Sequence, residues 1–418
     1  MPTATRMASE TGSFHPAAGP GQPRASRSRG RRRVAAALGV AAGVVAAGVC
    51  ALPPSGIPEP APIPAGAAEA VVAVAPRYGG SRLHRFWMGD GYREVWTTPV
   101  HAPVVDLGGV AGGLTPVRRG GGKQTRSLRL RGADGREYVF RSLDKDQAHT
   151  LPPLSRATVG RVRQDQVSAL HPGAALVAAG LEDAAGVPNA TPRLAVLPDV
   201  PELDGFRAAF GSLPGTLQLR PGPGFAGAGR LADTDELWPA LRRAAGDRVD
   251  LRAYLAVRLM DVYLGDWDRH GGQLTWARVE RGGVGTWIPI PRDRDYAFAN
   301  YGGVLPSLAR EVDPKIVRFD AEYRDLRGLL VKSRELDERL LCGLPAATWD
   351  SAATAMARSL TDRAIAAAIH RMPREYVARS APLAATLRAR RDRLPHAARR
   401  FRARLHAGSR CARGGFTG

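Results

Sequence analysis

The order of the expected secondary-structure elements constrains the fold of this chain more than any other feature. Thr125–Leu130 and Glu137–Leu143 alternate polar and apolar residues, and the turn residues Ala133-Asp134-Gly135 stand between them, which predicts a β-hairpin. In the second half of the chain the spacing of apolar residues is mostly helical. Strands that precede a block of helices are typical of an α+β fold. We therefore expect two lobes, a β-rich lobe over residues 71–205 and a mainly helical lobe over residues 206–406.

Further elements follow from the same patterns. We expect an irregular leader at 83–110, a helix at Leu170–Ala185 ended by Gly186, a short strand at Pro192–Leu197, a Gly/Pro-rich loop at Arg220–Gly229, helices at Leu237–Ala245 and Leu251–Leu264, and strands at Leu274–Val279 and Thr286–Ile290. The last two strands flank a glycine-rich turn, so they form a second hairpin inside the helical lobe.

The positive charge is concentrated at the two ends of the chain. The formal net charge is +21, to which residues 1–33 contribute +6 and residues 370–418 contribute +11. The 336 residues between these ends carry only +4. A nearly neutral body argues against a globule that binds nucleic acid over its whole surface. The first basic end, rich in Pro, Gly and Ser, is expected to be disordered.

An uncharged stretch follows the basic N-terminal end. Val34–Leu52 is nineteen residues of mostly Ala, Val and Gly, and it comes directly after Arg31-Arg32-Arg33. Arg residues before such a stretch are typical of an export signal or a single membrane anchor, and about 20 residues span a bilayer core. We expect residues 53–70, rich in Pro and Ala, to form an extended linker. The folded part is then expected in the cell envelope, outside the cytoplasm.

The basic C-terminal end has the pattern of an amphipathic helix. Leu383, Leu387, Leu394, Ala398 and Leu405 keep approximate helical spacing, while Arg residues cover the opposite side. A solvent-exposed outer helix is the first interpretation, and a basic face held against anionic lipid head groups is the second. Nucleic-acid binding comes third, because aromatic residues are few there. Residues 407–418 are expected to form a tail.

Cysteine usage is sparse. The three cysteines, Cys50, Cys342 and Cys411, lie far apart in the sequence, which predicts neither a disulfide scaffold nor a cysteine zinc site. Hydrophobic residues make up 44% of the chain, which is enough for a proper core. We therefore expect the body to be stabilised mainly by hydrophobic burial.

Two polar groups are candidates for chemistry. The denser one is Gly265-Asp266-Trp267-Asp268-Arg269-His270-Gly271-Gly272-Gln273, and Arg292-Asp293-Arg294-Asp295 follows about twenty residues later, across the expected second hairpin. Because the two ends of a hairpin lie side by side, both groups are expected to meet. A carboxylate that accepts a proton, an amide five residues later and carboxylates across a short hairpin suit metal-dependent phosphoryl transfer.

A glycine-rich turn and two cations belong to the first lobe. Gly120-Gly121-Gly122-Lys123-Gln124 stands just before the first hairpin, where backbone amides can approach phosphate groups. Arg141 on the second strand and Lys145 four residues later are candidates to neutralise an α- or β-phosphate. A flexible turn and a solvent-facing arginine are the plainer interpretations of the same residues.

Together these motifs resemble those of an atypical protein-kinase-like group that includes the HipA kinases, the phosphatidylinositol 3/4-kinases, the spore-coat CotH kinases and the secretory-pathway Golgi kinases. Those families share an Asp-Arg-His or Asp-x-His loop with Asn or a similar ligand five residues after the Asp, then a metal-binding Asp after a short hairpin. Asp268-Arg269-His270 with Gln273 matches the loop, and Pro289–Phe298 looks like the metal segment. The resemblance covers residues 114–300 and implies a two-lobed kinase-like fold that binds ATP and Mg²⁺.

The resemblance also implies a role for each matching residue. Asp268 is expected to be the catalytic base, with His270 supporting the same loop. Gln273 and either Asp293 or Asp295 are the expected metal ligands. The expected nucleotide contacts are Gly120, Gly121, Gly122, Gln124, Arg141 and Lys145. The acceptor of the phosphoryl group is left open, as a protein or a small molecule.

The chain departs from the pattern of these families at three places. Arg141 stands where they have a lysine, Gln273 replaces Asn, and Glu182 lies near the far end of its helix, where it is poorly placed to pair with the cation. Three alternatives therefore stay open: a catalytically inactive nucleotide-binding module (a pseudokinase), an enzyme that transfers a nucleotidyl group, and a structural protein whose acidic groups form only ion pairs.

Overall fold

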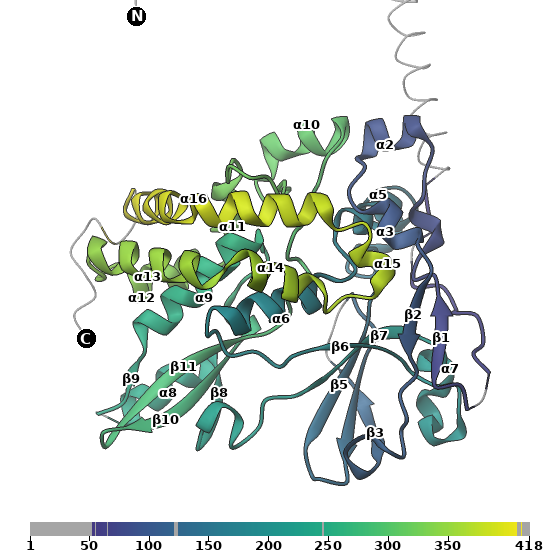
Figure 1. Ribbon diagram of the computed structural model, residues 1–418, viewed down its shortest axis with the longest axis horizontal. Coiled ribbons are helices and arrows are strands. Elements are labelled where there is room, and N and C mark those ends of the chain that lie inside the picture. The colour runs from purple at the N-terminus through teal and green to yellow at the C-terminus, as the bar shows by residue number, and fades with distance from the viewer. Residues whose placement is uncertain are drawn as a thin grey trace, which may run out of the picture. The chain divides into compact units, whose positions relative to one another are not determined.

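A computed structural model describes residues 52–54, 56–64, 66–120, 124–244, 246–407 and 411 of the protein (Figure 1). The expected basic end at 1–33 and the expected signal or anchor at 34–52, apart from Leu52, lie outside these residues, as do Gly121 and Gly122. The unit that begins at Leu52 is compact. Among the described helices there is none whose length and apolar character would carry it across a lipid bilayer.

The first lobe is built on a five-stranded antiparallel sheet with the strand order β3-β4-β5-β7-β6. Its strands are β3 (Leu114–Arg119), β4 (Ser127–Gly132), β5 (Glu137–Ser142), β6 (Arg193–Val196) and β7 (Pro214–Leu219). A separate ribbon pairs β1 (Glu69–Val72) with β2 (Val100–Pro103). β4 and β5 confirm the predicted first hairpin. β7 was not predicted, because its Pro-Gly start is unfavourable in a strand and only pairing with β5 and β6 compensates for it.

The helices that precede β7 in the chain are α2 (Arg82–Met88), α3 (Arg93–Thr97), α4 (Pro153–Ser155), α5 (Arg161–Asp165), α6 (Ala174–Ala184) and α7 (Arg207–Phe210). α6 confirms the helix predicted there. The irregular leader predicted at 83–110 is wrong, since α2 and α3 lie in it. The Ser81 side chain caps α2 by accepting a hydrogen bond from the His84 backbone N–H, and Arg93 of α3 is buried against Asp165 over 2.6 Å.

The second lobe carries a four-stranded sheet with the order β8-β10-β11-β9. Its strands are β8 (Arg230–Asp233), β9 (Arg248–Val249), β10 (Leu274–Arg281) and β11 (Val284–Pro291). β10 and β11 confirm the predicted second hairpin. Helix α9 (Leu251–Leu264) has the predicted bounds, because Asp250 caps its first turn and Gly265, with a φ of +67°, ends it in the left-handed conformation.

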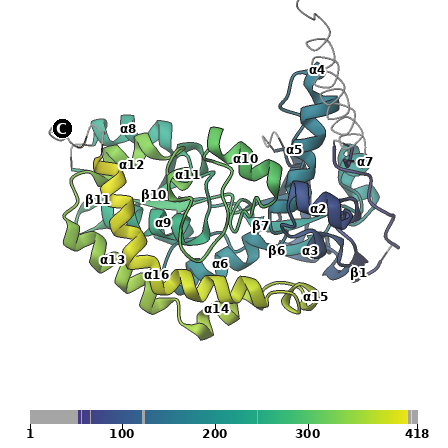
Figure 2. The ribbon, with the colours of Figure 1, turned by 90° about the horizontal axis from the view of Figure 1, so that it is seen from above.

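The remaining helices are α8 (Thr234–Arg243), α10 (Val304–Val312), α11 (Leu326–Leu329), α12 (Arg334–Leu341), α13 (Ala346–Ser359), α14 (Asp362–Ile369), α15 (Arg374–Val377) and α16 (Ala381–His406). Figure 2 shows the basic helix α16 lying along α13 and α14. All five apolar positions predicted for its inner face are buried. Arg390 is buried as well and donates to the backbone carbonyls of Val262 and Tyr263, so the basic residues of α16 do not all face solvent.

One disulfide joins Cys342, directly after α12, to Cys411 near the end of the chain. These cysteines are 69 residues apart in sequence, and their spacing gave no reason to pair them. The main hydrophobic core is continuous from α6 through α9 to α13 and α16, and a second core lies against the five-stranded sheet. The two-lobed α+β fold predicted from the sequence is confirmed.

Candidate active site

The β10–β11 hairpin brings the two predicted polar groups together, which we call the 266–273 loop and the 292–295 segment. Leu274, the first residue of β10, pairs with Pro291, the last residue of β11. Beyond this pair, the backbone N–H of Arg292 donates to the carbonyl oxygen of Gln273 over 2.8 Å. The loop before β10 and the segment after β11 therefore meet at the same end of the hairpin, as the sequence predicted.

Asp268 lies in the 266–273 loop with both of its carboxylate oxygens engaged. Its Oδ2 accepts a hydrogen bond from Gln273 Nε2 over 2.8 Å, so these two predicted site residues touch each other. Its Oδ1 forms an ion pair with Lys332. The Asp268 side chain is 13% exposed, whereas Asp266 is completely buried. Of the two aspartates in the loop, Asp268 is therefore the one that a substrate can reach.

His270 shapes the backbone of the same loop. Its Nδ1 accepts a hydrogen bond from the backbone N–H of Gly272 over 3.1 Å. Partial burial lowers the pKa of the imidazole, although the nearby Asp268 charge acts in the opposite direction. A neutral ring that accepts a bond from its own loop agrees with the supporting role expected for His270.

A buried charge network fixes the loop and the segment in position. Asp261 on α9 forms ion pairs with Arg258 on its own helix, with Arg269 in the loop and with Arg294 in the segment. Burial favours a raised pKa for Asp261, but the charges of Arg269, Arg294 and Arg258 outweigh this effect and lower the pKa to about 2. Asp261 therefore stays ionised and holds one arginine from each functional stretch.

Glu182 on α6 belongs to the same network. Its carboxylate accepts a hydrogen bond from Arg294 Nε over 2.7 Å, and Arg294 also reaches Asp266 over 3.0 Å. In the part of the chain that the structure describes, Glu182 therefore forms its ion pair with Arg294 of the 292–295 segment. Arg141 and Lys145 pair with other carboxylates. This agrees with the position of Glu182 at the far end of its helix.

The two acidic residues of the 292–295 segment are each held by one of the predicted cations. Lys145 Nζ lies 2.6 Å from Asp295 Oδ2, and Arg141 forms an ion pair with Asp293. Burial favours a raised pKa for Asp295, but the Lys145 charge outweighs it and lowers the pKa. The backbone of Asp293 has a φ of +56°, in the left-handed region that Asp tolerates better than most residues.

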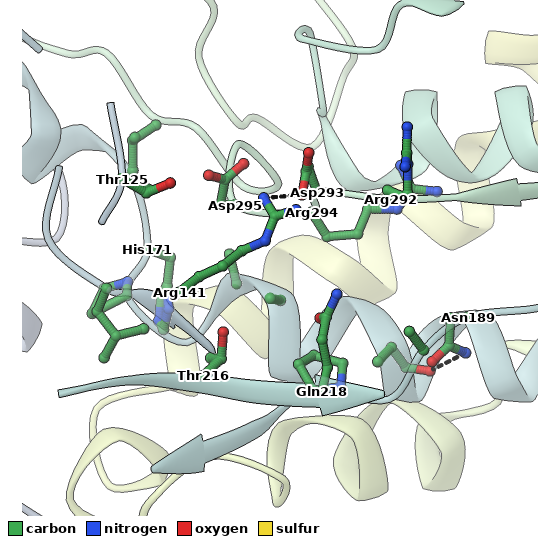
Figure 3. A pocket seen from close by; sticks show the side chains of 18 of the residues that line it. Thr125, Arg141, His171, Asn189, Thr216, Gln218, Arg292, Asp293, Arg294 and Asp295 are labelled. Carbon is green, nitrogen blue, oxygen red and sulfur yellow. Dashed lines mark hydrogen bonds and ion pairs between the residues drawn. The ribbon is translucent and has the colours of Figure 1, made fainter. Parts of the chain in front are cut away.

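A cleft lies between the five-stranded sheet, α6 and the 292–295 segment, with a volume of about 890 Å³ including its open mouth. Figure 3 shows Arg141 reaching from β5 toward Asp293 and Asp295, with Thr216 and Gln218 on the neighbouring strand β7. His171 also lines the cleft, and burial lowers its pKa to about 3, so the ring is neutral.

The glycine-rich turn is described only at its two ends. A Cβ on Gly120 would come within 2.3 Å of Ser127 Oγ, so the close approach of β3 and β4 requires glycine there. Gln124 Oε1 accepts a hydrogen bond from the Tyr296 hydroxyl over 2.8 Å, which ties the turn to the residue after Asp295. Gly121 and Gly122 lie outside the described residues, so their contact with phosphates stays a prediction.

A row of contacts connects Asp295 with Asp268. Lys145 Nζ, bound to Asp295, lies 3.8 Å from the centroid of the Tyr296 ring. That ring packs edge-on against Trp267, with the centroids 4.8 Å apart. Lys332 Nζ, bound to Asp268, lies 5.1 Å from the centroid of Trp267. This row of side chains joins Asp295, which lines the cleft, to Asp268, which is not among the residues that line it.

Lys332 was missed by the sequence reasoning, because it lies 64 residues after Asp268 and belongs to no motif. One signal was present in the composition. Only four of the sixty basic residues are lysines, namely Lys123, Lys145, Lys315 and Lys332. Two of the four hold carboxylates of the candidate site. In a chain that otherwise uses arginine, a lysine at such a place indicates a need for a compact charge on a flexible stem.

The donors at this site suit a hard cation such as Mg²⁺. The carboxylates of Asp293 and Asp295 and the amide of Gln273 offer oxygen ligands. Within the described ranges there is no group of three or more His, Cys, Asp or Glu that could hold a metal ion. A Mg²⁺ ion here would need further oxygen atoms from water or a bound phosphate, which is how proteins usually bind Mg²⁺.

The solved structures that match this chain include the following three. The Helicobacter pylori proinflammatory kinase CtkA is 12% identical over 70% of this chain and 95% of its own, with a TM-score of 0.37. Shewanella oneidensis HipA, solved with HipB and operator DNA, is 16% identical over 69% of this chain and 74% of its own, with a TM-score of 0.34. The Golgi casein kinase is 11% identical over 81% of this chain and 85% of its own, with a TM-score of 0.35.

No protein-family model and no curated protein matches the chain. At these TM-scores the function has to be argued from the residues of this chain itself.

Proposed function

We propose that this protein is a kinase-like phosphotransferase that binds ATP with Mg²⁺ in the cleft between its lobes. One observation carries the proposal: a row of side-chain contacts joins Asp268 and its Gln273 partner to Asp295 and its Lys145 partner, although these residues come from three separate parts of the chain. A proton-accepting carboxylate, a metal-binding carboxylate and a phosphate-binding cation are the parts that phosphoryl transfer requires.

The proposed nucleotide position follows from the charges in the cleft. Lys145 and Arg141 supply positive charge at the sheet side, where the α- and β-phosphates would lie. Asp295 would be the main metal-binding acid, because its partner Lys145 is buried and holds it in a fixed place, and Gln273 would contribute an amide oxygen. When bound, Mg²⁺ would neutralise the negative charge that develops on the phosphate during transfer.

The proposed reaction is transfer to an acceptor hydroxyl on a protein or a small molecule. The hydroxyl oxygen forms a bond to the γ-phosphorus while its proton passes to Asp268. The bond from the γ-phosphorus to the bridging oxygen breaks, and that oxygen keeps the electron pair as ADP leaves. His270 and the buried arginines Arg269 and Arg294 hold the geometry and take no part in the bond changes.

We further propose that the protein is exported and lies in the cell envelope. The uncharged stretch at 34–52, preceded by arginines, supports export. The pairing of Cys342 with Cys411 supports it independently, because disulfides are typical of proteins outside the reducing cytoplasm. Protein from the oxidising compartment should carry this disulfide.

A nucleotide-binding module without transfer activity is the second candidate. It is favoured by the pairing of every predicted acid with a base: Asp268 with Lys332, Asp293 with Arg141, and Asp295 with Lys145. Such a module would bind ATP and leave an acceptor unchanged. The intact mass of the acceptor distinguishes nucleotidyl transfer from these two possibilities, because a nucleotidyl group adds a larger mass than a phosphoryl group and a module without activity adds none.

We expect ATP to stabilise the full chain in a Mg²⁺-dependent manner. At a hundredfold excess over the dissociation constant a ligand stabilises the folded state by about 2.7 kcal/mol, which is a shift of several degrees in the unfolding temperature. Thermal unfolding with ATP, with and without Mg²⁺, measures this, and Asp295→Asn should remove the Mg²⁺-dependent part. A wild-type protein that shows no shift at millimolar ATP and Mg²⁺ would contradict the proposed function.

A further inference from the structure

We propose that Lys332 binds the phosphoryl group that is transferred, the γ-phosphate of ATP, and so allows this site to distinguish a triphosphate from a diphosphate. The inference rests on the proposed function and assigns to it a residue from outside the 114–300 stretch that carries the motifs. It starts from the ion pair between Lys332 Nζ and Asp268 Oδ1. A cation on the proton-accepting carboxylate lies where the γ-phosphate must come during transfer.

The segment that carries Lys332 is firmly anchored. The next residue, Ser333, is buried, and its hydroxyl donates to Asp337 Oδ2 over 3.1 Å. Asp337 in turn accepts a hydrogen bond from Arg258 Nε over 2.8 Å, and Arg258 is bound to Asp261. The backbone at residue 332 is therefore tied to the same buried network that fixes the 266–273 loop. The position of Lys332 beside Asp268 is built into the fold.

The Lys332 side chain is the more accessible of the two partners of Asp268. It is 34% exposed, whereas the Gln273 partner of Asp268 is buried. Both oxygens of Asp268 are engaged, so an acceptor hydroxyl can approach only if one partner gives way. Lys332 is the partner that can leave. A γ-phosphate beside Lys332 is a stronger anionic group than the Asp268 carboxylate. When the Lys332 ammonium group moves from Asp268 to that phosphate, Asp268 Oδ1 becomes free to accept the proton.

The use of lysine at this place supports the assignment. Lysine carries a compact charge with three donors on a flexible stem, which suits a contact that must move between a carboxylate and a phosphate. Lys332 Nζ lies 5.1 Å from the centroid of the Trp267 ring, so the ring stabilises the charge beside Asp268. Lys145, which is 3% exposed and has a fixed partner, lacks this freedom.

Equilibrium binding of two nucleotides to the full chain tests the proposal. We expect Lys332→Met to weaken the binding of a non-hydrolysable ATP analogue with Mg²⁺ by roughly tenfold or more and to change ADP binding less than about twofold, because only the analogue has the γ-phosphate. Lys332→Arg keeps the positive charge, so this variant should retain most of the preference for the ATP analogue over ADP. Lys315→Met is the matched control, since Lys315 pairs with Asp313 over 3.4 Å outside the cleft, and it should change neither affinity.

The outcomes separate this inference from the proposed function. If the wild type binds both nucleotides and Lys332→Met weakens both equally or neither, the assignment of Lys332 is wrong and the proposed function stands. If the wild type binds neither nucleotide, the proposed function fails and the inference falls with it. Far-ultraviolet circular dichroism and the unfolding temperature of each variant should match those of the wild type, because Lys332 is a partly exposed side chain.

Discussion

Asp268→Asn is expected to lower phosphoryl transfer by about 10²- to 10⁴-fold, the range usually lost with a general base. The asparagine side chain has nearly the same shape and can still accept a hydrogen bond from Gln273, so the 266–273 loop should keep its conformation. It cannot take up the proton of an acceptor hydroxyl. Nucleotide binding should persist, because the proposed phosphate and metal contacts, Lys145 and Asp295, are unchanged in this variant.

The measurement is the release of ADP and the incorporation of labelled γ-phosphate into the protein itself or an added acceptor. Asp350→Asn is the matched control. Asp350 also forms one ion pair, with Arg399 over 2.8 Å, but it lies on α13 outside the cleft, so the rate should not change. Equal rates in the wild type and Asp268→Asn would contradict the role of Asp268. Nucleotide binding without any transfer in the wild type would select the inactive module.

Asp261→Asn is expected to cost about 3–5 kcal/mol of unfolding free energy, the range found when one partner of a buried ion pair is removed. The loss is large because Asp261 is completely buried and neutralises three arginines, Arg258, Arg269 and Arg294. Without its charge, those guanidinium groups keep Asp266, Glu182 and Asp337 as buried acidic partners. The 266–273 loop and the 292–295 segment should lose order together.

Denaturant unfolding of the variant measures this loss. Asp350→Asn again serves as the control, because its carboxylate is 45% exposed and an exposed ion pair contributes only about 0–1 kcal/mol. A loss below about 1 kcal/mol for Asp261→Asn would show that the buried network is not what holds the site together.

The local features of the fold could be predicted from the sequence because their signals are local. The turn at Ala133-Asp134-Gly135 and the glycines at 282–285 mark the two hairpins, and Asp250 and Gly265 mark the ends of α9. The second hairpin alone was enough to bring Asp268 and Asp295 into one region. The predicted site therefore rested on one correct pairing of strands.

The features that could not be predicted depend on contacts between distant residues. β7 forms because β5 and β6 pair with it, despite its Pro-Gly start. The region of α2 and α3 was misread because buried contacts such as Arg93 with Asp165 hold a stretch that lacks helical periodicity. Lys332 carries no motif and reaches Asp268 only through the packing of α12 against α9. Local patterns contain no information about such contacts.

The most direct test of the account is a crystal structure of the protein with a non-hydrolysable ATP analogue and Mn²⁺ in place of Mg²⁺. We expect anomalous density for the metal within coordination distance of Asp295, with the phosphates beside Lys145 and the terminal phosphate between Lys332 and Asp268. A nucleotide bound elsewhere on the molecule, or a metal that touches neither Asp295 nor Asp293, would contradict it.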